Sequence, residues 1–255
     1  MKVFARPIIA TLLLFFSVAV PAQTLQGAVD WNRRVSLGFG LSGQVKVVTV
    51  QAGDAVVRDG VLAELDATLF QIALDKAANT EKLSQVEMEG QQADFEREQT
   101  LFDEGSLSTV QLELEALELV RAESAYRNAQ LERQAAQYLL GLARLKAPFN
   151  AWVIESGFSP GQFVNPDSDE SPEITLAERG RYLAKTRIDG QAIGAFSGNP
   201  EVRVRIGDRI FEAISSHIGL EPVHQAPDQA QYSFTVEFAT DELIRPGTPC
   251  TVVLP

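Results

Sequence analysis

The chain changes its hydrophobic periodicity twice along its length. Between residues 35 and 66, short apolar runs rich in valine alternate with turns such as Ala52-Gly53-Asp54 and Arg58-Asp59-Gly60, which is the pattern of short β-strands. Residues 68–144 contain no proline and are dominated by Ala, Leu, Glu, Gln and Arg, which are good helix formers. From residue 146 onwards, strand patterns return. The predicted strands cover residues 37–41, 44–50, 56–57, 61–65, 151–155, 162–164, 201–206, 232–238 and 250–254.

The helical region is interrupted once, at Asp103-Glu104-Gly105-Ser106. Gly105 suits the end of one helix, and Ser106 or Ser108 suits the N-cap of the next. Two helices of roughly 35 residues each would be about 50 Å long, and a connection this short makes them antiparallel. We therefore predict a long antiparallel helical hairpin over residues 67–145.

Both predicted helices carry apolar residues at steps of three and four, and we interpret these residues as the seam between them. Gly90 weakens the first helix by about 1 kcal/mol relative to alanine, and Arg121, Ser124 and Asn128 interrupt the apolar pattern of the second. A seam this thin predicts that the hairpin gains stability by packing beside copies of itself or a partner. The predicted seam residues are Leu69, Ile72, Leu83, Val86, Ala93 and Leu101 in the first helix, and Val110, Leu114, Leu117, Leu131, Ala135, Leu142 and Leu145 in the second.

Strand patterns stand on both sides of this helical insert. An antiparallel hairpin returns the chain to its starting point, so strands before and after it can pair in one small β-sandwich. A short internal repeat supports this pairing, because Gly53-Asp54-Ala55-Val56 and Gly161-Gln162-Phe163-Val164 each read as a turn followed by a short strand.

The N-terminus has the pattern of a signal peptide. Lys2 and Arg6 precede an almost wholly apolar run, and Val20-Pro21-Ala22 offers small residues at a cleavage site. The apolar run of about 13 residues is short of the roughly 20 that span a bilayer. We expect residues 1–22 to be removed and the mature chain to start at Gln23, with an uncleaved membrane anchor as the alternative.

Composition excludes several classes of function. A formal charge of −12 over 255 residues argues against nucleic-acid binding, which needs clustered Lys and Arg. A single cysteine, Cys250, excludes an internal disulfide framework, and two histidines leave little for a metal site. No Ser-His-Asp set or phosphate-binding glycine loop is discernible. We therefore expect no enzyme activity, no metal and no cofactor.

Short motifs around the hairpin occur in a particular order. Each motif alone is weak, but together they resemble the periplasmic adaptor subunits of tripartite efflux pumps, also called membrane fusion proteins of the HlyD/RND type. The motifs are Gly43-Gln44-Val45, Gly53-Asp54 and Leu62-Ala63-Glu64-Leu65-Asp66 before the hairpin, Leu145-Lys146-Ala147-Pro148-Phe149 and Gly161-Gln162 after it, and then Gly207-Asp208-Arg209 and Leu243-Ile244-Arg245-Pro246-Gly247.

The resemblance implies an α+β multidomain fold. A split lipoyl-like β-sandwich (the barrel-sandwich hybrid) would comprise residues 35–66 and 146–172, with the coiled-coil hairpin of residues 67–145 inserted and a small β-barrel domain at residues 173–255. A true lipoyl or biotinyl carrier presents a modifiable lysine on a tight turn. The corresponding turns here, residues 51–54 and 157–161, contain no lysine, which argues against a carrier role.

A finer motif lies at the expected hairpin tip. Adaptors of this family that dock an outer-membrane channel carry Arg-x3-Leu-x6-Ser there, and Arg97, Leu101 and Ser108 have this spacing. A guanidinium, an apolar side chain and a hydroxyl could meet backbone carbonyls and a small apolar notch on a channel. The alternative is structural: Leu101 is a seam residue, Arg97 is a solvated charge and Ser108 is an N-cap.

The function implied by the resemblance is that of a periplasmic adaptor for efflux. Such a protein links an inner-membrane transporter, of the RND rather than the ABC class, to an outer-membrane channel, and it self-associates into a ring. Many relatives continue into a membrane-proximal β-domain built from both termini, whereas here only Gln23 to Arg34 precedes the first lipoyl half. We therefore expect transporter contact to differ from the usual manner. The alternative function is an envelope coiled-coil scaffold without a transporter partner.

Overall fold

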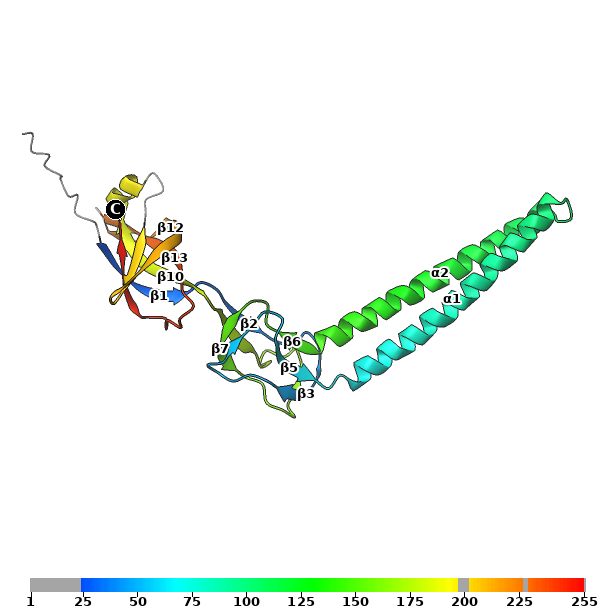
Figure 1. The fold of residues 1–255 in the computed structure, drawn as a ribbon, viewed down its shortest axis with the longest axis horizontal. Coiled ribbons are helices and arrows are strands. Elements are labelled where there is room, and N and C mark those ends of the chain that lie inside the picture. Colours follow the sequence, from blue (N-terminus) through cyan, green and yellow to red (C-terminus); the bar gives the residue numbers. More distant parts are fainter. Residues whose placement is uncertain (1–23, 197–201, 227–228, 255) are drawn as a thin grey trace, which may run out of the picture. The chain divides into compact units, whose positions relative to one another are not determined.

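A computed structural model describes residues 24–196, 202–226 and 229–254 (Figure 1). The chain divides into two compact units. One unit contains the described residues up to Asp30 and from Arg181 onwards, and the other contains Trp31–Gly180. The predicted signal peptide, residues 1–22, lies outside the described residues. Among the described helices, none is both long enough and apolar enough to cross a membrane.

The unit of residues 31–180 contains two four-stranded sheets and a helical hairpin. One sheet has the order β2-β9-β7-β4 and the other has the order β6-β5-β3-β8, so each sheet takes two strands from each side of the hairpin. The pairing of strands across the insert, predicted from the sequence, is thus present. The strands are β2 (Arg34–Leu37), β3 (Gly43–Val48), β4 (Ala55–Val56), β5 (Val61–Leu65), β6 (Arg144–Lys146), β7 (Ala151–Ser156), β8 (Phe163–Val164) and β9 (Ile174–Glu178).

The internal repeat occupies equivalent places in the two halves. Gly53 and Gly161 both have positive φ angles, 96° and 86°, which glycine adopts without steric cost. The N–H of Gly53 donates to the carbonyl of Val153, and the N–H of Gly161 donates to the carbonyl of Val45, both at 2.8 Å. Each half of the chain therefore holds the turn of the other half, and neither half can complete its sheets alone.

The core of this unit lies between the two sheets. Val45, Leu62 and Leu65 come from the strands before the hairpin, and Val153 and Leu176 come from the strands after it. All five side chains are at most 1% exposed. The hydrophobic core therefore joins segments that are separated by more than 75 residues of sequence, roughly the length of the hairpin insert.

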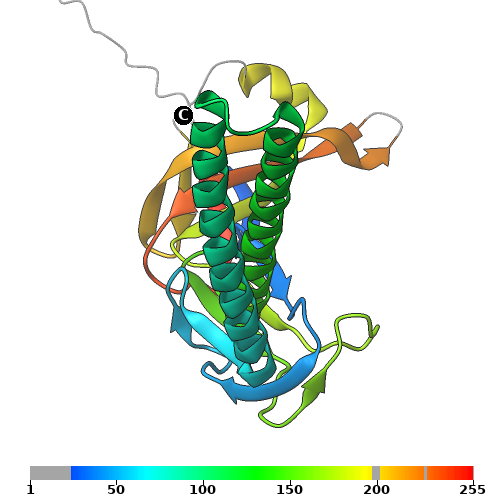
Figure 2. The ribbon, with the colours of Figure 1, turned by 90° about the vertical axis from the view of Figure 1, so that its right-hand side faces the viewer.

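Helices α1 (Thr68–Asp103) and α2 (Thr109–Leu142) form the predicted antiparallel hairpin (Figures 1 and 2). An ion pair between Glu81 and Arg133 joins the two helices and indicates which residues lie level with one another. Counting equally in opposite directions from this pair places Phe95 level with Leu119. At the base, β5 and β6 pair side by side, so the two ends of the hairpin leave and enter the same sheet.

The prediction of which residues form the hairpin seam was wrong. All the predicted residues except Leu142 and Leu145 are exposed; Leu83 and Val86, for example, are each 60% exposed. The residues of the actual seam also recur every three or four positions, but on the opposite face of each helix. It contains Phe70, Leu74, Ala77, Glu81, Ser84, Met88, Gln91, Phe95, Glu98 and Phe102 of α1, and Leu112, Glu115, Leu119, Ala122, Tyr126, Ala129, Arg133, Ala136 and Leu140 of α2.

The seam combines small side chains with large apolar ones. Alanines at positions 77, 122, 129 and 136 recur along the seam, and small residues let helices approach closely while aromatic residues fill the space between them. Ala129 is the only fully buried residue among those of the two helices. The seam is therefore tight but narrow, with polar residues at several layers.

The other unit is a closed six-stranded barrel with the order β1-β10-β13-β12-β11-β14. Buried Tyr182, Phe234 and Phe238 fill its interior. The hydroxyl of Tyr182 donates to the carbonyl of Glu242 at 2.9 Å and accepts from the N–H of Ile244 at 3.2 Å. Its elements are β1 (Thr24–Trp31), β10 (Arg181–Asp189), the short 3-10 helix η1 (Gly190–Phe196), β11 (Arg203–Ile206), β12 (Arg209–Ala226), β13 (Gln229–Ala239) and β14 (Pro249–Val253).

The α+β class with a barrel and one long helical hairpin is confirmed, but the units divide differently from the expected boundaries. Strand β1, where no strand is predicted from the sequence, closes the barrel against β14 and β10. Strand β9, expected in the barrel, lies instead between β2 and β7. The expected strand at residues 37–41 is also absent, because the chain leaves β2 at Leu37 and bends. This bend places Phe39 in the core, 5.1 Å from the ring of Phe158.

Candidate docking site at the hairpin tip

Helix α1 ends in a glycine-dependent cap. Gly105 has a φ angle of 75°, which a residue with a side chain rarely adopts. The N–H of Gly105 donates to the carbonyl of Phe102 at 2.9 Å, and the N–H of Ser106 donates to the carbonyl of Leu101 at 2.8 Å. These two bonds satisfy carbonyls that the helix end leaves without partners. The helix end predicted at Gly105 is thus confirmed.

Helix α2 begins with a capping box. The hydroxyl of Ser108 donates to Oε1 of Gln111 at 2.9 Å and accepts from the N–H of Gln111 at 3.3 Å. The N–H of Ser108 also donates to Oε1 of Gln111, at 3.3 Å. Ser108, not Ser106, is therefore the N-cap. Its hydroxyl keeps one free acceptor lone pair for an external donor, so capping leaves it a limited capacity for contact.

The other two motif residues lie one turn apart on α1. NH1 of Arg97 is 2.8 Å from Oδ1 of Asp94, and the arginine side chain is 65% exposed. Leu101 is 36% exposed, at the edge of the seam that Phe102 enters. The structure therefore leaves Arg97 and part of Leu101 accessible within two turns of the tip, and it places Ser108 immediately after the loop.

The charge around Arg97 is strongly acidic. Arg97 is the only Lys or Arg between residues 83 and 120, a stretch that holds ten Asp or Glu. An exposed ion pair such as Arg97–Asp94 contributes little stability in water. The guanidinium can therefore exchange Asp94 for an external carbonyl or carboxylate at small cost. It is the single cationic group that the tip offers to a partner.

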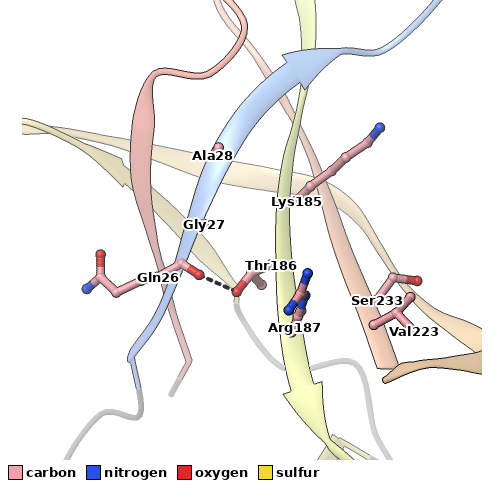
Figure 3. Close-up of a pocket in the computed structure, with 8 residues that line it drawn as sticks. All are labelled: Gln26, Gly27, Ala28, Lys185, Thr186, Arg187, Val223 and Ser233. Atoms are coloured by element: carbon pink, nitrogen blue, oxygen red, sulfur yellow. Dashed lines mark hydrogen bonds between the residues drawn. The ribbon is translucent and has the colours of Figure 1, made fainter. Parts of the chain in front are cut away.

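Elsewhere, the barrel surface carries an open hollow of about 460 Å³ (Figure 3). Lys185 and Arg187 line it from β10, but Nζ of Lys185 already pairs with Asp30 at 2.6 Å. The hydroxyl of Thr186 donates to the carbonyl of Gln26 at 2.6 Å. This bond and the absence of a side chain at Gly27 allow β1 to lie against β10. The hollow is therefore a consequence of how the two strands pack, and its lining contains no set of catalytic groups.

The cysteine and the histidines add no reactive centre. Cys250 is buried, and burial raises the pKa of its thiol to about 11, so the reactive thiolate is scarce at neutral pH. His217 and His224 are exposed on β12. Among the described residues, no group of three or more His, Cys, Asp or Glu side chains is placed to hold a metal ion.

Comparison with known proteins relates this architecture to a family. No family model matches the chain. In sequence, the chain is 25% identical over 181 residues to the macrolide export protein MacA of Escherichia coli O157:H7, a match that covers 64% of this chain and 47% of the relative. In structure, the membrane fusion protein Spr0693 of Streptococcus pneumoniae R6 superposes with a TM-score of 0.68 at 15% identity, over 91% of this chain and 98% of that one. The chain shares the fold of the membrane fusion proteins.

The resemblance to membrane fusion proteins that the sequence motifs indicate is thereby confirmed. MacA of Actinobacillus actinomycetemcomitans also gives a TM-score of 0.68, at 17% identity over 92% of this chain and 78% of that one. A MacA–MexA chimera that carries the hairpin of Pseudomonas aeruginosa MexA gives 0.62 at 19% identity, over 91% and 81%. The chain spans about half the length of the MacA relative from E. coli, 47%.

Proposed function

We propose that the protein is a non-enzymatic periplasmic adaptor that links an inner-membrane transporter to an outer-membrane channel for efflux. The observation that carries the proposal is the hairpin of 36 and 34 residues, about 50 Å long, inserted into a small two-sheet unit of a membrane fusion fold. Only the base of the hairpin, around Phe70 and Ala143, packs with the core between the two sheets. The rest of the hairpin is suited to bridging distance and to contacting other helices.

The two β-rich units would share the contact with neighbouring copies around the transporter. The two-sheet unit would be lipoyl-like. This proposal is supported by its internal repeat and by the hydrogen bonds that each half accepts from the turn of the other half. It and the barrel would pack laterally around the transporter, in a ring of several copies. We expect the transporter to be of the RND rather than the ABC class, and residues 1–22 to direct export and be removed.

The tip would contact the channel through Arg97, Leu101 and Ser108. The proposal is supported by three features: the lone guanidinium in an acidic stretch, the partly exposed apolar side chain beside it, and the acceptor lone pair left on the capped serine. Docked against helical hairpins of a channel, Arg97 would donate charge-assisted hydrogen bonds to backbone carbonyls, which are stronger than neutral ones.

The test is a pull-down of the coexpressed outer-membrane channel, together with efflux in cells that lack the wild-type gene. Arg97→Glu is expected to weaken channel binding at least tenfold, because reversal removes the charge-assisted bonds and sets a carboxylate against carbonyls. The matched control is Arg121→Glu, since Arg121 is similarly exposed and also pairs with an acid three residues earlier, Glu118.

Two results would overturn the proposal. Equal binding by the two variants would make the tip motif ordinary helix surface. Failure of the wild-type chain to recover any transporter or channel would favour the alternative, an envelope scaffold without a transporter partner. Sequencing of the N-terminus from envelope material tests export separately, with Gln23 expected and Met1 indicating an uncleaved anchor.

A further inference from the structure

Strand β12 carries most of the exposed apolar side chains of the barrel unit. The described part of this unit exposes five large apolar residues, and four of them lie on β12. These four are Ile210, Ile214, Leu220 and Val223, which are 61%, 50%, 92% and 54% exposed. Single exposed apolar residues are normal on a protein surface, whereas several on one strand mark a surface that contacts something apolar.

A bulge in β12 contains the most exposed of these side chains. The register between β12 and β13 shifts after Ile218, so that residues 219–221 lie opposite Ser233 alone. Bulges bend a strand and re-aim its side chains. Leu220, in the middle of this bulge, has the largest exposed fraction among the large apolar residues that the structure describes. The fold therefore presents a leucine to the surroundings from within a paired strand.

A cationic group lies beside this apolar surface. Val223 and Ser233 line one side of the open hollow, and Arg187 of β10 also lines it (Figure 3). Arg187 and Ser233 are partners in the register of β10 and β13. The arginine side chain is exposed, and no acid of the described residues forms an ion pair with it. The hollow thus offers a free guanidinium and a hydroxyl next to an apolar side chain.

The acids near the hollow are mostly engaged. Asp30 binds Nζ of Lys185 at 2.6 Å, and Asp189 accepts a hydrogen bond from a glutamine amide at 3.1 Å. Glu221, in the bulge, is exposed and forms no ion pair within the described part of the chain. The arginine is therefore available to an external anion, and Glu221 weakens the attraction.

One edge of β12 is open beside the bulge. Backbone bonds join β12 to the β11 side only as far as Ala213, and no described strand covers that edge beyond this residue. An open edge exposes N–H and C=O groups, which need water or polar partners. A strand added from another protein would supply them, but Pro222 and the bulge interrupt the regular ladder that strand addition requires. The headgroup layer of a membrane supplies water and phosphate, with the acyl boundary just below it.

We propose that this β12 surface, formed by Leu220, Val223 and Arg187, binds the anionic surface of a lipid membrane. Arg187 contacts a lipid phosphate, the two aliphatic side chains enter the acyl boundary, and Glu221 opposes binding. The contact goes beyond the adaptor role and does not depend on it, because it attaches the barrel to lipid directly and not through a transporter.

The test is binding of the purified chain, starting at Gln23, to lipid vesicles without any transporter or channel. Vesicles of phosphatidylglycerol have a negative surface, and vesicles of phosphatidylcholine are the neutral comparison. We expect the chain to sediment with the first kind, and about fivefold less of it with the second. Failure to bind phosphatidylglycerol vesicles, or equal binding to the two kinds, would overturn the proposal.

Two variants test the surface itself. Leu220→Ser and Arg187→Gln are each expected to weaken binding to phosphatidylglycerol about fivefold, through loss of apolar burial and of one basic contact. The matched controls are Leu69→Ser, at a hairpin leucine that is 76% exposed, and Arg205→Gln. Arg205 is exposed on β11, three strands around the six-stranded barrel from β10. Equal losses in the test and control variants would remove this surface from the contact.

A fluorescent label tests whether the bulge enters the membrane. In Leu220→Cys, an environment-sensitive fluorophore is expected to shift its emission to the blue when phosphatidylglycerol vesicles are added, whereas the same label in Leu69→Cys is not. Native Cys250 is buried with a thiol pKa of about 11, so it stays unlabelled. Glu221→Gln is expected to strengthen binding about fivefold, because it removes a negative charge beside the lipid. An unshifted label at position 220 would contradict insertion.

Recovery of the transporter and the channel is measured separately. Vesicle binding without that recovery would contradict the adaptor role and leave the lipid contact standing. A Leu220→Ser variant that loses the transporter but keeps its vesicle binding would assign the surface to a protein partner and overturn the proposal. Thermal melting of every variant checks that the barrel is folded.

Discussion

The two-sheet unit and the hairpin that grows out of it use apolar residues in opposite ways. In the sheets, Leu62 and Leu176 are fully buried, whereas in the hairpin Leu83 and Val86 are each 60% exposed. The sheets close their core with residues from both sides of the insert. The hairpin encloses only a narrow seam, and it leaves a second row of aliphatic side chains outside.

This difference indicates where stability arises and where recognition occurs. Burial of apolar surface stabilises the sheets by about 25 cal/mol for each Å² removed from water. The same side chains on the outer face of a helix contribute little until a partner covers them. The two-sheet unit and the barrel thus bury their own apolar cores, whereas the hairpin exposes apolar side chains that a partner could cover.

The largest expected effect is a difference in stability between two leucine-to-alanine variants. Leu62→Ala, at a fully buried position of β5, is expected to lower the free energy of unfolding of the sheet unit by about 2–5 kcal/mol, because it leaves a cavity. Leu83→Ala on the hairpin is expected to cost less than about 0.5 kcal/mol in dilute solution. Urea titration followed by tryptophan fluorescence measures both. Similar losses for the two variants would mean that the hairpin is as tightly packed as the sheets.

The next largest effect is a loss of barrel stability when two closely packed strands are forced apart. A Cβ added at Gly27 would lie 2.4 Å from the carbonyl oxygen of Lys185, a backbone atom that cannot move aside. Gly27→Ala is therefore expected to destabilise the barrel by about 1–3 kcal/mol through overpacking. Gly194→Ala, where nothing lies near the added carbon, is the control. A barrel unchanged by Gly27→Ala in thermal melting would contradict the close approach of β1 to β10.

A smaller effect concerns the start of α2. Ser108→Ala removes the capping box, and it is expected to cost about 1 kcal/mol, confined to the tip. Hydrogen exchange of the first turn of α2 should accelerate, while exchange in the sheets stays unchanged. Ser124→Ala, whose hydroxyl only bonds back to the carbonyl of Val120, is the control. Faster exchange throughout the chain would show that the tip is coupled to the core.

The smallest effect lies where the hairpin joins the sheets. The side-chain and backbone hydrogen bonds from Thr68 hold the pKa of Asp66 below its ordinary value. Since the folded pKa is lowered, the contribution of these bonds is present above the ordinary pKa of aspartate, about 4, and is lost as pH falls through the folded value. Thr68→Ala should raise the pKa of Asp66 in an NMR titration, and Thr100→Ala should not. No change with Thr68→Ala would assign the lowered pKa to the backbone N–H of residue 68, which the variant keeps, and to Lys46.

Much of the fold could be predicted because its signals are local. The absence of proline from residues 68–144 and the glycine at position 105 predict two helices and their break, and the repeated turns at Gly53 and Gly161 predict equivalent places in two halves. The sheets to which β1 and β9 belong could not be predicted. Strand β1 has eight residues, and nothing in its own sequence identifies β10 and β14, the strands that it pairs with more than 150 residues later.

The candidate tip site was predictable as a spacing but not as a geometry. Arg97, Leu101 and Ser108 stand out in the sequence, yet the hydrogen bonds that occupy Ser108 and the pairing of Arg97 with Asp94 follow from the folded tip. The ion pair between Glu81 and Arg133 has no local signature, because its residues are 52 positions apart and become neighbours only when the helices meet.

By itself, the sequence determined that this protein has two long helices between two groups of strands, because helix propensity, glycine position and strand alternation act over a few residues. It also placed two rows of periodic residues on each helix, with large apolar side chains in both. Which row faces inward is decided only when the helices meet. The two helices leave and re-enter adjacent strands of one sheet, so they run close together, and the inward row fills the space between them with aromatic residues such as Phe95 and Tyr126 beside its alanines. The aliphatic residues of the other row remain outside, where they are available to other molecules.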